Sequence, residues 1–316
     1  MPREYANSAM PASPGSARPA AGPIVRPERR LLGIAMMVGA VGFFAVLDTL
    51  TKTLTAHFDT GQILFGRFLF FAMALSVTLR RLGWRTLVGT RQPRLQILRA
   101  AEMMASTVVY TVALIYLPIA TAISIGFFWP LAVTVLAIPM LGERVGANRW
   151  AAVALGFAAV VAIIRPGAEV FHWASLLPVL SGTLYACFQI HARILSRTDN
   201  ATTTLFYSTA LSLAVFSVWA PFVWKSPSLD QWLMMAGTGL VAFLGHYLLI
   251  KAIEVAPASL LAPFGYAKLV FGLVLGFLVF GDFPDTVTLA AAGVLTLTGI
   301  YISYRERTAG KLDDGR

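Results

Sequence analysis

Long apolar runs, separated by short polar gaps, dominate the chain from residue 31 onward. An α-helix needs roughly 20 residues to cross the hydrocarbon of a bilayer, and each run has about that length. The pattern therefore predicts ten membrane-spanning helices. They cover residues 31–54, 61–79, 95–117, 119–141, 149–166, 172–194, 203–224, 230–253, 257–280 and 286–304.

The composition agrees with a bilayer as the solvent of this chain. Of the 316 residues, 57% are hydrophobic and only 13% are charged, whereas an ordinary soluble domain has about 25% charged residues. A soluble domain could not bury so much apolar surface, and the exposed remainder would aggregate. The composition therefore excludes a disordered chain, argues against a soluble protein and predicts an all-α membrane protein.

The basic residues are distributed unevenly between the two sides of the predicted bundle. If the N-terminus lies inside, the tails and inner loops contain 20 of the 25 Lys and Arg residues, whereas the outer loops contain only Arg165 and Lys225. An excess of Lys and Arg marks cytoplasmic loops. The protein is therefore predicted to lie in the inner membrane with both termini in the cytoplasm. The net charge of +10 is explained by orientation, so no nucleic-acid partner is predicted.

The two ends of the chain are predicted as cytoplasmic tails. Residues 1–30 contain many prolines mixed with Ala, Ser and Gly, which is typical of disorder, and residues 306–316 form the second tail. No apolar segment precedes a cleavage site, so no removable signal peptide is predicted. The single cysteine, Cys187, permits no intrachain disulfide.

Proline landmarks, and glycines followed by an acid, recur at one spacing in the two halves of the chain. At an offset of 139 residues, Pro118 aligns with Pro257, and Gly142-Glu143 aligns with Gly281-Asp282. Near the first helix the offset is 141, and DTLTK at 48–52 aligns with QIHAR at 189–193. The chain is therefore interpreted as an internal repeat.

Each repeat contains five predicted helices, the first in residues 31–166 and the second in residues 167–305. Because five is odd, the second repeat must enter the membrane in the opposite orientation. Inverted repeats with a binding site near the bilayer midplane are typical of secondary transporters. The expected fold is thus ten transmembrane helices in two inverted five-helix repeats.

Three charged residues are predicted near the outer ends of the first two helices. Asp48 and Arg67 lie about 9 Å deep, at 1.5 Å per residue. Lys52 is one turn above Asp48 on the same helix face. This geometry permits a network of all three. Two interpretations stay open, namely an ion cluster that fixes the two helices and a gating or coupling site.

Glu102 lies in the inner half of the third predicted helix, and Arg99 is one turn closer to water. Their spacing permits an ion pair. One interpretation is an interfacial pair whose long side chains reach the membrane surface. The other is that Glu102 carries a coupling proton.

Lys268 is predicted near the midplane of the ninth helix, where it cannot easily reach either surface. Trp129, its equivalent at the offset of 139, is also central. An aromatic face and an ammonium group suit a ligand with a flat or apolar part and an anionic group. The alternative is that Lys268 pairs with Glu102 or Asp48 and that Trp129 packs in the core. Ionisable groups at this depth are costly and need a partner or water.

Further aromatic and polar side chains on the predicted helices could line a cavity with stacking surfaces and hydrogen-bond partners. They are Tyr110, Tyr185, Gln189, His191, His246, Tyr247 and Tyr266. The histidines lack the spacing of metal ligands, so neither a metal nor a cofactor is predicted. Pro130 and Pro263 are candidate hinges, because they lie beside glycines at related depths in the fourth and ninth helices.

Several motifs resemble the drug/metabolite transporter superfamily, in particular its EamA-type members. They are Asp48-x-x-x-Lys52, FGRF around Arg67, YLPIATA at the end of the third helix, LGERV at 141–145 and APASLLAPFGYAKLVFGLVLGFLVFGDFPD at 256–285. Within the superfamily the chain is similar to the branch that contains S-adenosylmethionine and riboflavin uptake carriers. The resemblance covers the whole membrane part of the chain.

This resemblance implies a central cavity lined by the first, third, fourth, sixth, eighth and ninth helices, and transport by alternating access. It also implies that the fifth and tenth helices pack at the periphery. Lys268 departs from the family pattern, which leaves the substrate open.

The expected function is secondary active transport of a small organic metabolite. The metabolite would be amino-acid-, nucleoside- or vitamin-like, with an anionic or zwitterionic group. Its other partners would be the bilayer and a coupling ion such as a proton, and monomer and homodimer both stay open. The alternatives are an exporter of amino acids or drugs and an intramembrane enzyme for lipid-linked substrates. An enzyme is not expected, because the sequence contains no catalytic motif and no nucleophile-base pair.

Overall fold

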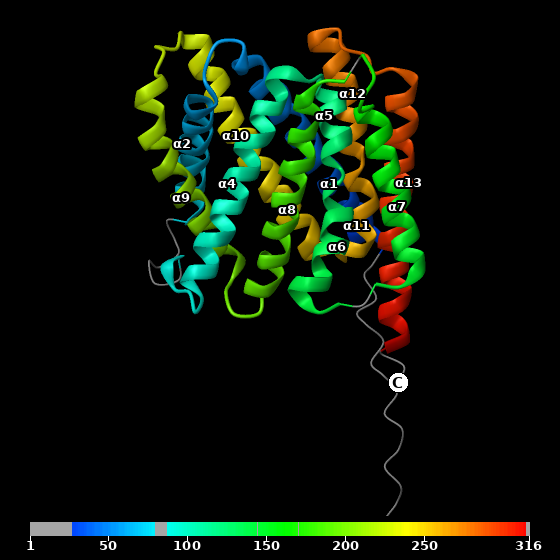
Figure 1. Ribbon diagram of the computed structural model, residues 1–316. Helices are drawn as coiled ribbons and strands as arrows, with labels where there is room; N and C mark the ends of the chain where they lie inside the picture. The colour runs from blue at the N-terminus through cyan, green and yellow to red at the C-terminus, as the bar shows by residue number, and fades with distance from the viewer. Residues whose placement is uncertain (1–26, 80–86, 144, 170, 314–316) are drawn as a thin grey trace, which may run out of the picture.

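The computed structural model describes residues 27–79, 87–143, 145–169 and 171–313 (Figure 1). Residues 1–26 of the expected N-terminal tail and the last three residues of the chain lie outside this description. The first helix begins at Pro27, inside the range expected for the tail, and the last helix continues to Asp313.

Every regular element in the described part of the chain is a helix. The α-helices are α1 (Pro27–Thr55), α2 (Thr60–Leu79), α4 (Pro93–Tyr116), α5 (Ile119–Gly126), α6 (Trp129–Leu141), α7 (Ala147–Ile164), α8 (Leu176–Leu195), α9 (Ala201–Trp219), α10 (Leu229–Val255), α11 (Ala258–Gly265), α12 (Ala267–Phe280) and α13 (Thr286–Asp313). Two short 3₁₀ helices cover Trp173–Ser175 and Ala220–Val223.

These helices make ten crossings of the bundle. Nine segments in the described residues are long and apolar enough to span a membrane, and Thr286–Tyr301 is a shorter apolar helix in the tenth position. The fourth crossing consists of α5 and α6, and the ninth consists of α11 and α12. The all-α membrane fold predicted from the apolar runs is confirmed.

The two halves of the chain pack in corresponding ways. Helix α1 packs against α10 as α8 packs against α4, and α2 packs against α10 as α9 packs against α4. Helix α1 also contacts α12 as α8 contacts α6. In each comparison, a helix of the first repeat contacts a helix of the second, and the equivalent helices of the two repeats make the same contact with their roles interchanged. Two repeats related by a two-fold axis are expected to pack in this way.

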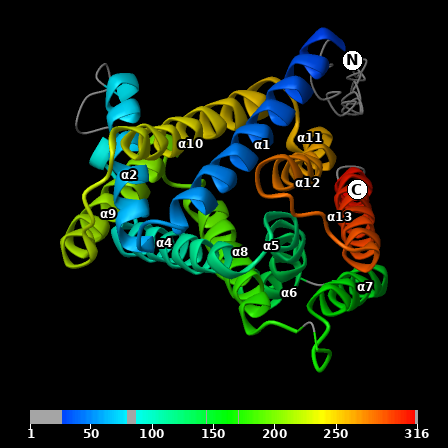
Figure 2. The same ribbon diagram turned by 90° about the horizontal axis from the view of Figure 1, so that it is seen from above.

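Helices α7 and α13, the last of each repeat, lie together at one edge of the bundle (Figure 2). Small side chains at their contact, including Ala152, Ala159 and Ala291, belong to one buried apolar cluster. Small residues let helices approach closely in a membrane. The peripheral position implied for the fifth and tenth helices is therefore the one observed.

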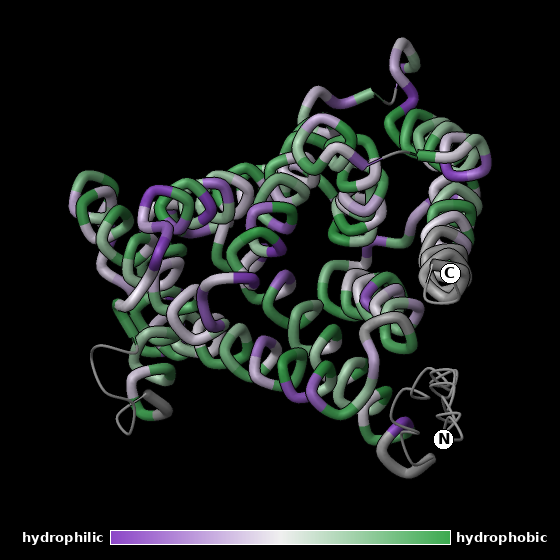
Figure 3. The backbone as a smooth tube through the Cα atoms, turned by 90° about the horizontal axis from the view of Figure 1, so that it is seen from below, coloured by the Kyte–Doolittle hydropathy of each residue, from purple (hydrophilic) through white to green (hydrophobic). Residues whose placement is uncertain are grey.

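The outside of the bundle is apolar. Large side chains such as Val218, Phe222 and Leu278 are exposed on it. Figure 3 shows apolar, green positions along most of the helices, with fewer hydrophilic, purple positions among them. Such a surface suits lipid as its solvent, because helices pair most of their backbone polar groups internally.

Asp199, in the loop between α8 and α9, ties this loop to the segment before α4. Its carboxylate accepts hydrogen bonds from Thr90 Oγ1, from Gln96 Nε2 at 2.7 Å and from the backbone N–H of Arg91 at 3.3 Å. Partial burial opposes ionisation, but these hydrogen bonds outweigh it and hold the pKa of Asp199 below its ordinary value. The clamp helps to fix α4 beside α8 and α9.

Gly239 marks a close approach of α10 to α2. A Cβ atom there would lie 2.6 Å from Phe70 Cβ and 2.7 Å from the backbone O of Arg67. We expect Gly239→Ala to lower the free energy of unfolding by about 1–3 kcal/mol, because the backbone of α2 cannot move aside cheaply. Thermal unfolding in detergent measures the loss. Gly293→Ala is the matched control, since nothing lies within 4 Å of its added Cβ. Equal midpoints for the two variants would contradict the close approach.

Candidate functional site

The fourth and ninth crossings are both interrupted near their middle. The helix of the fourth crossing ends at Gly126 and restarts at Trp129, and that of the ninth ends at Gly265 and restarts at Ala267. Gly126 and Gly265 are equivalent at the offset of 139 residues. The breaks predicted from glycine and proline positions therefore exist, and they exist at corresponding places in the two repeats.

The two predicted hinge prolines lie at these breaks. Pro130 is in the first turn of α6, and Pro263 lies inside α11, two residues before that helix ends. Proline lacks a backbone N–H and cannot continue the helical hydrogen-bond ladder toward its N-terminal side. Pro130 thus accounts for the interruption before α6, whereas the break after Gly265 lies on the C-terminal side of Pro263. The role of each proline as a hinge stays a proposal.

Phe127 and Tyr266 occupy the two breaks and stack on each other. Their ring centroids are 4.8 Å apart and their planes differ by 26°. The two residues are equivalent in the repeat. The axis that relates the repeats therefore passes close to this stacked pair, and the two breaks lie together at the centre of the bundle.

Asp48 forms an ion pair with Lys268, which follows the break of the ninth crossing by two residues. The distance from Asp48 Oδ2 to Lys268 Nζ is 2.7 Å, and the side chains are 10% and 23% exposed. The Tyr110 hydroxyl donates a hydrogen bond of 3.3 Å to the same carboxylate oxygen. The ammonium group also lies 5.7 Å from the centre of the Tyr110 ring. Helices α1, α4 and α12 thus each contribute one group to a central polar cluster.

Asp48, Lys52 and Arg67 do not form the three-member network that the helix spacing permits. Lys52 Nζ instead donates to the backbone O of Leu117 at 2.5 Å and lies 3.9 Å from Asp282 Oδ2. Arg67 lies within electrostatic range of Asp48 without an ion pair to it. The packing of the helices explains this difference. Helix α12 places Lys268 against Asp48, whereas the long Lys52 side chain reaches the end of the bundle where α4 and α12 end.

Glu102 does not pair with Arg99 either. Glu102 Oε2 lies 2.8 Å from His191 Nδ1 of α8, and both side chains are 13% exposed. Arg99 donates a hydrogen bond of 3.0 Å to Ser208 Oγ, and its guanidinium lies 4.1 Å from the centre of the Phe188 ring. The expected interfacial pair is therefore replaced by contacts between α4, α8 and α9.

The predicted aromatic ligands fall into separate groups. Trp129 meets Tyr185 edge to face at 5.4 Å between ring centroids, and Tyr185 stacks on Phe188 at 5.3 Å. Gln189, the repeat equivalent of Asp48, is half-buried on the same helix. Trp129 and Gln189 therefore occupy, in their half of the bundle, the positions that Lys268 and Asp48 occupy in the other half.

His246 occupies a packing position between helices. Its Nδ1–H donates to the backbone O of Ala242 at 2.8 Å, and its ring meets Phe44 and Phe71 edge to face at 5.0 and 5.8 Å. These contacts join α10 to α1 and α2. Tyr247 is exposed at the outside of the bundle. The structure thus places neither residue in the Asp48–Lys268–Tyr110 cluster.

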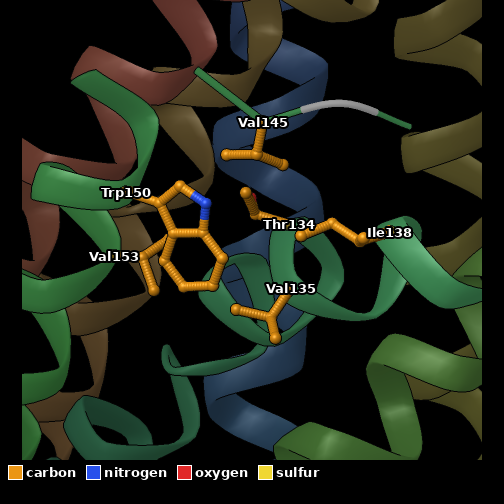
Figure 4. A pocket seen from close by; sticks show the side chains of 6 residues that line it. All are labelled: Thr134, Val135, Ile138, Val145, Trp150 and Val153. Carbon is orange, nitrogen blue, oxygen red and sulfur yellow. The ribbon is translucent and has the colours of Figure 1, made fainter. Parts of the chain in front are cut away.

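A small crevice between α6 and α7 is a separate feature (Figure 4). It has no room for a water molecule, and it is lined by Thr134, Val135, Ile138, Val145, Trp150 and Val153. Pockets for small organic ligands are about 300–1,000 Å³ and combine apolar walls with a few polar groups. The crevice is too small and too apolar for a metabolite, and it shares no residue with the central cluster.

Sequence reasoning did not identify three residues that form ion pairs at the two ends of the bundle. Asp282 lies near Lys52, and Glu143 accepts from Arg193 at 2.8 Å. The signal was present in the repeat, because Gly142-Glu143 aligns with Gly281-Asp282, and Lys52 aligns with Arg193. Aligned residues of opposite charge at both ends of the two repeats would have revealed these pairs.

Comparison with known proteins gives a family and several relatives. The EamA-like transporter family matches this chain twice, over residues 31–165 and 172–305. These two matches correspond to the two repeats. A solved crystal structure shares the fold with a TM-score of 0.57 at 19% identity, and the match covers 88% of this chain and 97% of that one.

Curated relatives cover nearly the same span. An S-adenosylmethionine uptake transporter of Rickettsia bellii is 28% identical, and the match covers 88% of this chain and 95% of that protein. A riboflavin transporter of Vibrio cholerae is 29% identical over 87% of this chain and 94% of that protein. A pseudopaline exporter of Pseudomonas aeruginosa is 24% identical over 87% of this chain and 97% of that protein. All three relatives are transporters.

Proposed function

Because this chain belongs to the EamA-like transporter family, we propose that it carries a small organic zwitterion with a flat or apolar part across the inner membrane. It is a multi-pass membrane transporter, and its relatives move small molecules. The proposal comprises the substrate class, the alternating-access mechanism and the orientation.

The observation that carries this proposal is the Asp48–Lys268 pair. Buried charges are costly unless they are paired. An anionic substrate alone would take Lys268 and leave Asp48 without its partner. A zwitterion brings one group of each sign, so its carboxylate can pair with Lys268 while its ammonium group pairs with Asp48. Both protein charges then stay neutralised during binding.

Aromatic side chains support a flat or apolar part of the substrate. Trp129 is the repeat equivalent of Lys268, and its ring meets that of Tyr185. The stacked Phe127 and Tyr266 lie at the two helix breaks between these positions. A ligand that bridged the two repeats would therefore meet charge on one side and aromatic rings on the other.

The repeat architecture supports alternating access. The interrupted crossings bring backbone breaks of both repeats to one place, which is the usual position of a transport site. Rocking of the two repeats about this place would expose it first to one face and then to the other. The 20 Lys and Arg residues of the tails and inner loops support a cytoplasmic location for the lower face in Figure 1, where α4 and α9 begin and α6 and α8 end.

Counterflow into proteoliposomes tests the proposed function. The panel contains labelled S-adenosylmethionine and aromatic amino acids as zwitterions, riboflavin as a flat solute without a zwitterionic group, and a dicarboxylate. We expect saturable exchange of one of the zwitterions and none of riboflavin or the dicarboxylate. Exchange confined to riboflavin or the dicarboxylate would refute the substrate class, and no saturable exchange of any compound would refute the carrier. Repeating the assay with a pH gradient tests proton coupling.

An export function is the second candidate, because one of the relatives is a pseudopaline exporter. The same vesicles distinguish the two directions. In right-side-out vesicles, an exporter is expected to give a faster net flux with an outward substrate gradient than with an inward substrate gradient of the same size.

A further inference from the structure

We propose that two ion pairs at opposite ends of the bundle act as the gates of the transport cycle, Arg193–Glu143 at the lower face and Lys52–Asp282 at the upper face. This inference rests on the alternating-access mechanism of the proposed function. It assigns a role to four residues outside the central polar cluster, of which the sequence had singled out Lys52 alone as a candidate gating or coupling residue.

The lower pair joins α8 to the end of α6. Arg193 lies in the last turn of α8, and its Nη1 is 2.8 Å from Glu143 Oε1. Glu143 follows Gly142, the residue that ends α6. The pair therefore connects the first helix of the second repeat to the fourth crossing of the first repeat, below the break at Phe127.

The upper pair joins α1 to the end of α12. Lys52 Nζ lies 3.9 Å from Asp282 Oδ2 and donates to the backbone O of Leu117 at 2.5 Å. Its ammonium group also lies 5.4 Å from the centre of the Phe280 ring. The pair connects the first helix of the first repeat to the ninth crossing of the second repeat, above the break at Tyr266.

The two pairs are equivalent by the repeat in both of their members. Lys52 aligns with Arg193 at the offset of 141, and Glu143 aligns with Asp282 at the offset of 139. The sign of each charge is the same in the two halves, with Lys replaced by Arg and Glu replaced by Asp. A chance surface contact would not recur at both ends with the same order of charges.

The backbone that presents the two acids is also the same. Gly142 and Gly281 both have a left-handed conformation, with φ of 71° and 70°. The N–H of Glu143 bonds to the backbone O of Ala137 at 3.3 Å, and the N–H of Asp282 bonds to that of Gly276 at 3.2 Å. Glycine adopts positive φ without strain, so this cap holds each acid at a defined place beyond the helix end.

Each ion pair is weak enough to break and re-form during a transport cycle. Glu143 and Asp282 are 34% and 36% exposed, so water competes for both carboxylates. Ion pairs of this exposure contribute little to stability, which lets them break and re-form. Both gates are closed in this structure. When the repeats rock, the pair on the opening side must separate, because its two members belong to different repeats.

Sided labelling of a central cysteine tests the gates without any substrate. The background variant is Cys187→Ser, and Gln189→Cys supplies the reporter, since Gln189 is half-buried and equivalent to Asp48. A membrane-impermeant maleimide is added to whole cells for the upper face and to inside-out vesicles for the lower face. The measured quantity is the ratio of the two labelling rates.

We expect Glu143→Gln to raise the lower-to-upper labelling ratio by about fivefold and Asp282→Asn to lower it by about the same factor, as a surface ion pair permits. The charge-swapped double variant Glu143→Arg/Arg193→Glu should return the ratio toward that of the background. Glu254→Gln is the matched control and should leave the ratio unchanged. It breaks the exposed Lys251–Glu254 pair, whose two members lie on one helix.

A shift of the labelling ratio in the same direction for both gate variants would contradict the proposal, because it would not depend on which ion pair was broken. An unchanged ratio in both variants would contradict it as well, because neither ion pair would then control access. The outcome is separate from that of the counterflow assay. Opposite shifts without zwitterion exchange would refute the substrate class and leave the gates standing. Zwitterion exchange with an unchanged ratio would refute the gates alone.

Discussion

Replacing Lys268 with alanine is expected to abolish saturable transport while the protein still inserts and folds. The variant removes the ammonium group proposed to bind the substrate carboxylate. Losing one partner of a buried, hydrogen-bonded charge pair typically costs 2–5 kcal/mol in binding, so we expect uptake to fall by at least about 30-fold. Asp48 keeps the hydrogen bond from Tyr110 and the nearby charge of Arg67, which allows insertion.

Initial rates of counterflow in proteoliposomes measure this loss, and a monodisperse elution profile in detergent verifies the fold. Lys251→Ala is the matched control, because Lys251 also belongs to an ion pair but is exposed near the end of α10. It should keep uptake within about twofold of the unmodified protein. Normal transport by the Lys268→Ala variant would remove Lys268 from the site.

Replacing Asp48 with asparagine is expected to destabilise the fold more than the loss of Lys268. The ammonium group of Lys268 would then be buried without its carboxylate, and Arg67 of the same sign lies nearby. Breaking a buried ion pair by removing one partner costs about 3–5 kcal/mol. We therefore expect a loss of this size in the free energy of unfolding, measured by denaturation in mixed detergent micelles.

The double variant Asp48→Asn/Lys268→Met separates stability from function. Replacing both members of a buried pair by groups without charge is often neutral for stability. The double variant should therefore recover most of the lost unfolding free energy and still fail to transport. Stability as low as that of Asp48→Asn would show that the pair is not the source of the loss. Recovered transport would contradict binding of a zwitterion by these two charges.

Local features of the sequence were sufficient for the helices and their interruptions. Ten apolar runs of membrane-spanning length predicted the ten crossings, which the structure confirms. Gly126 and Gly265, with Pro130 and Pro263 beside them, correctly predicted the two breaks. These predictions succeed because helix length and the missing N–H of proline depend on neighbouring residues alone.

Partner choice among charged side chains could not be predicted in the same way. The spacing on α1 made Lys52 a natural neighbour of Asp48, and the sequence left both Glu102 and Asp48 open as partners of Lys268. The packing of α12 brings Lys268 to Asp48. The spacing on α4 suggested Arg99 for Glu102, yet α8 supplies His191. Spacing along one helix limits which side chains can meet, but it carries no information about the helix that packs opposite.

The sequence by itself thus determined a ten-helix membrane protein, its repeat and the places where its helices break, since these follow from local hydrophobicity, backbone chemistry and self-similarity. Only the tertiary structure decided that Asp48 pairs with Lys268 and that equivalent ion pairs lie at both ends of the bundle. A buried charged side chain pairs with the opposite charge that helix packing brings within about 4 Å. At that distance, in a medium of low dielectric constant, the Coulomb attraction between the two groups is strong, and it weakens as their separation grows. The partner is therefore a property of how the two repeats fit together.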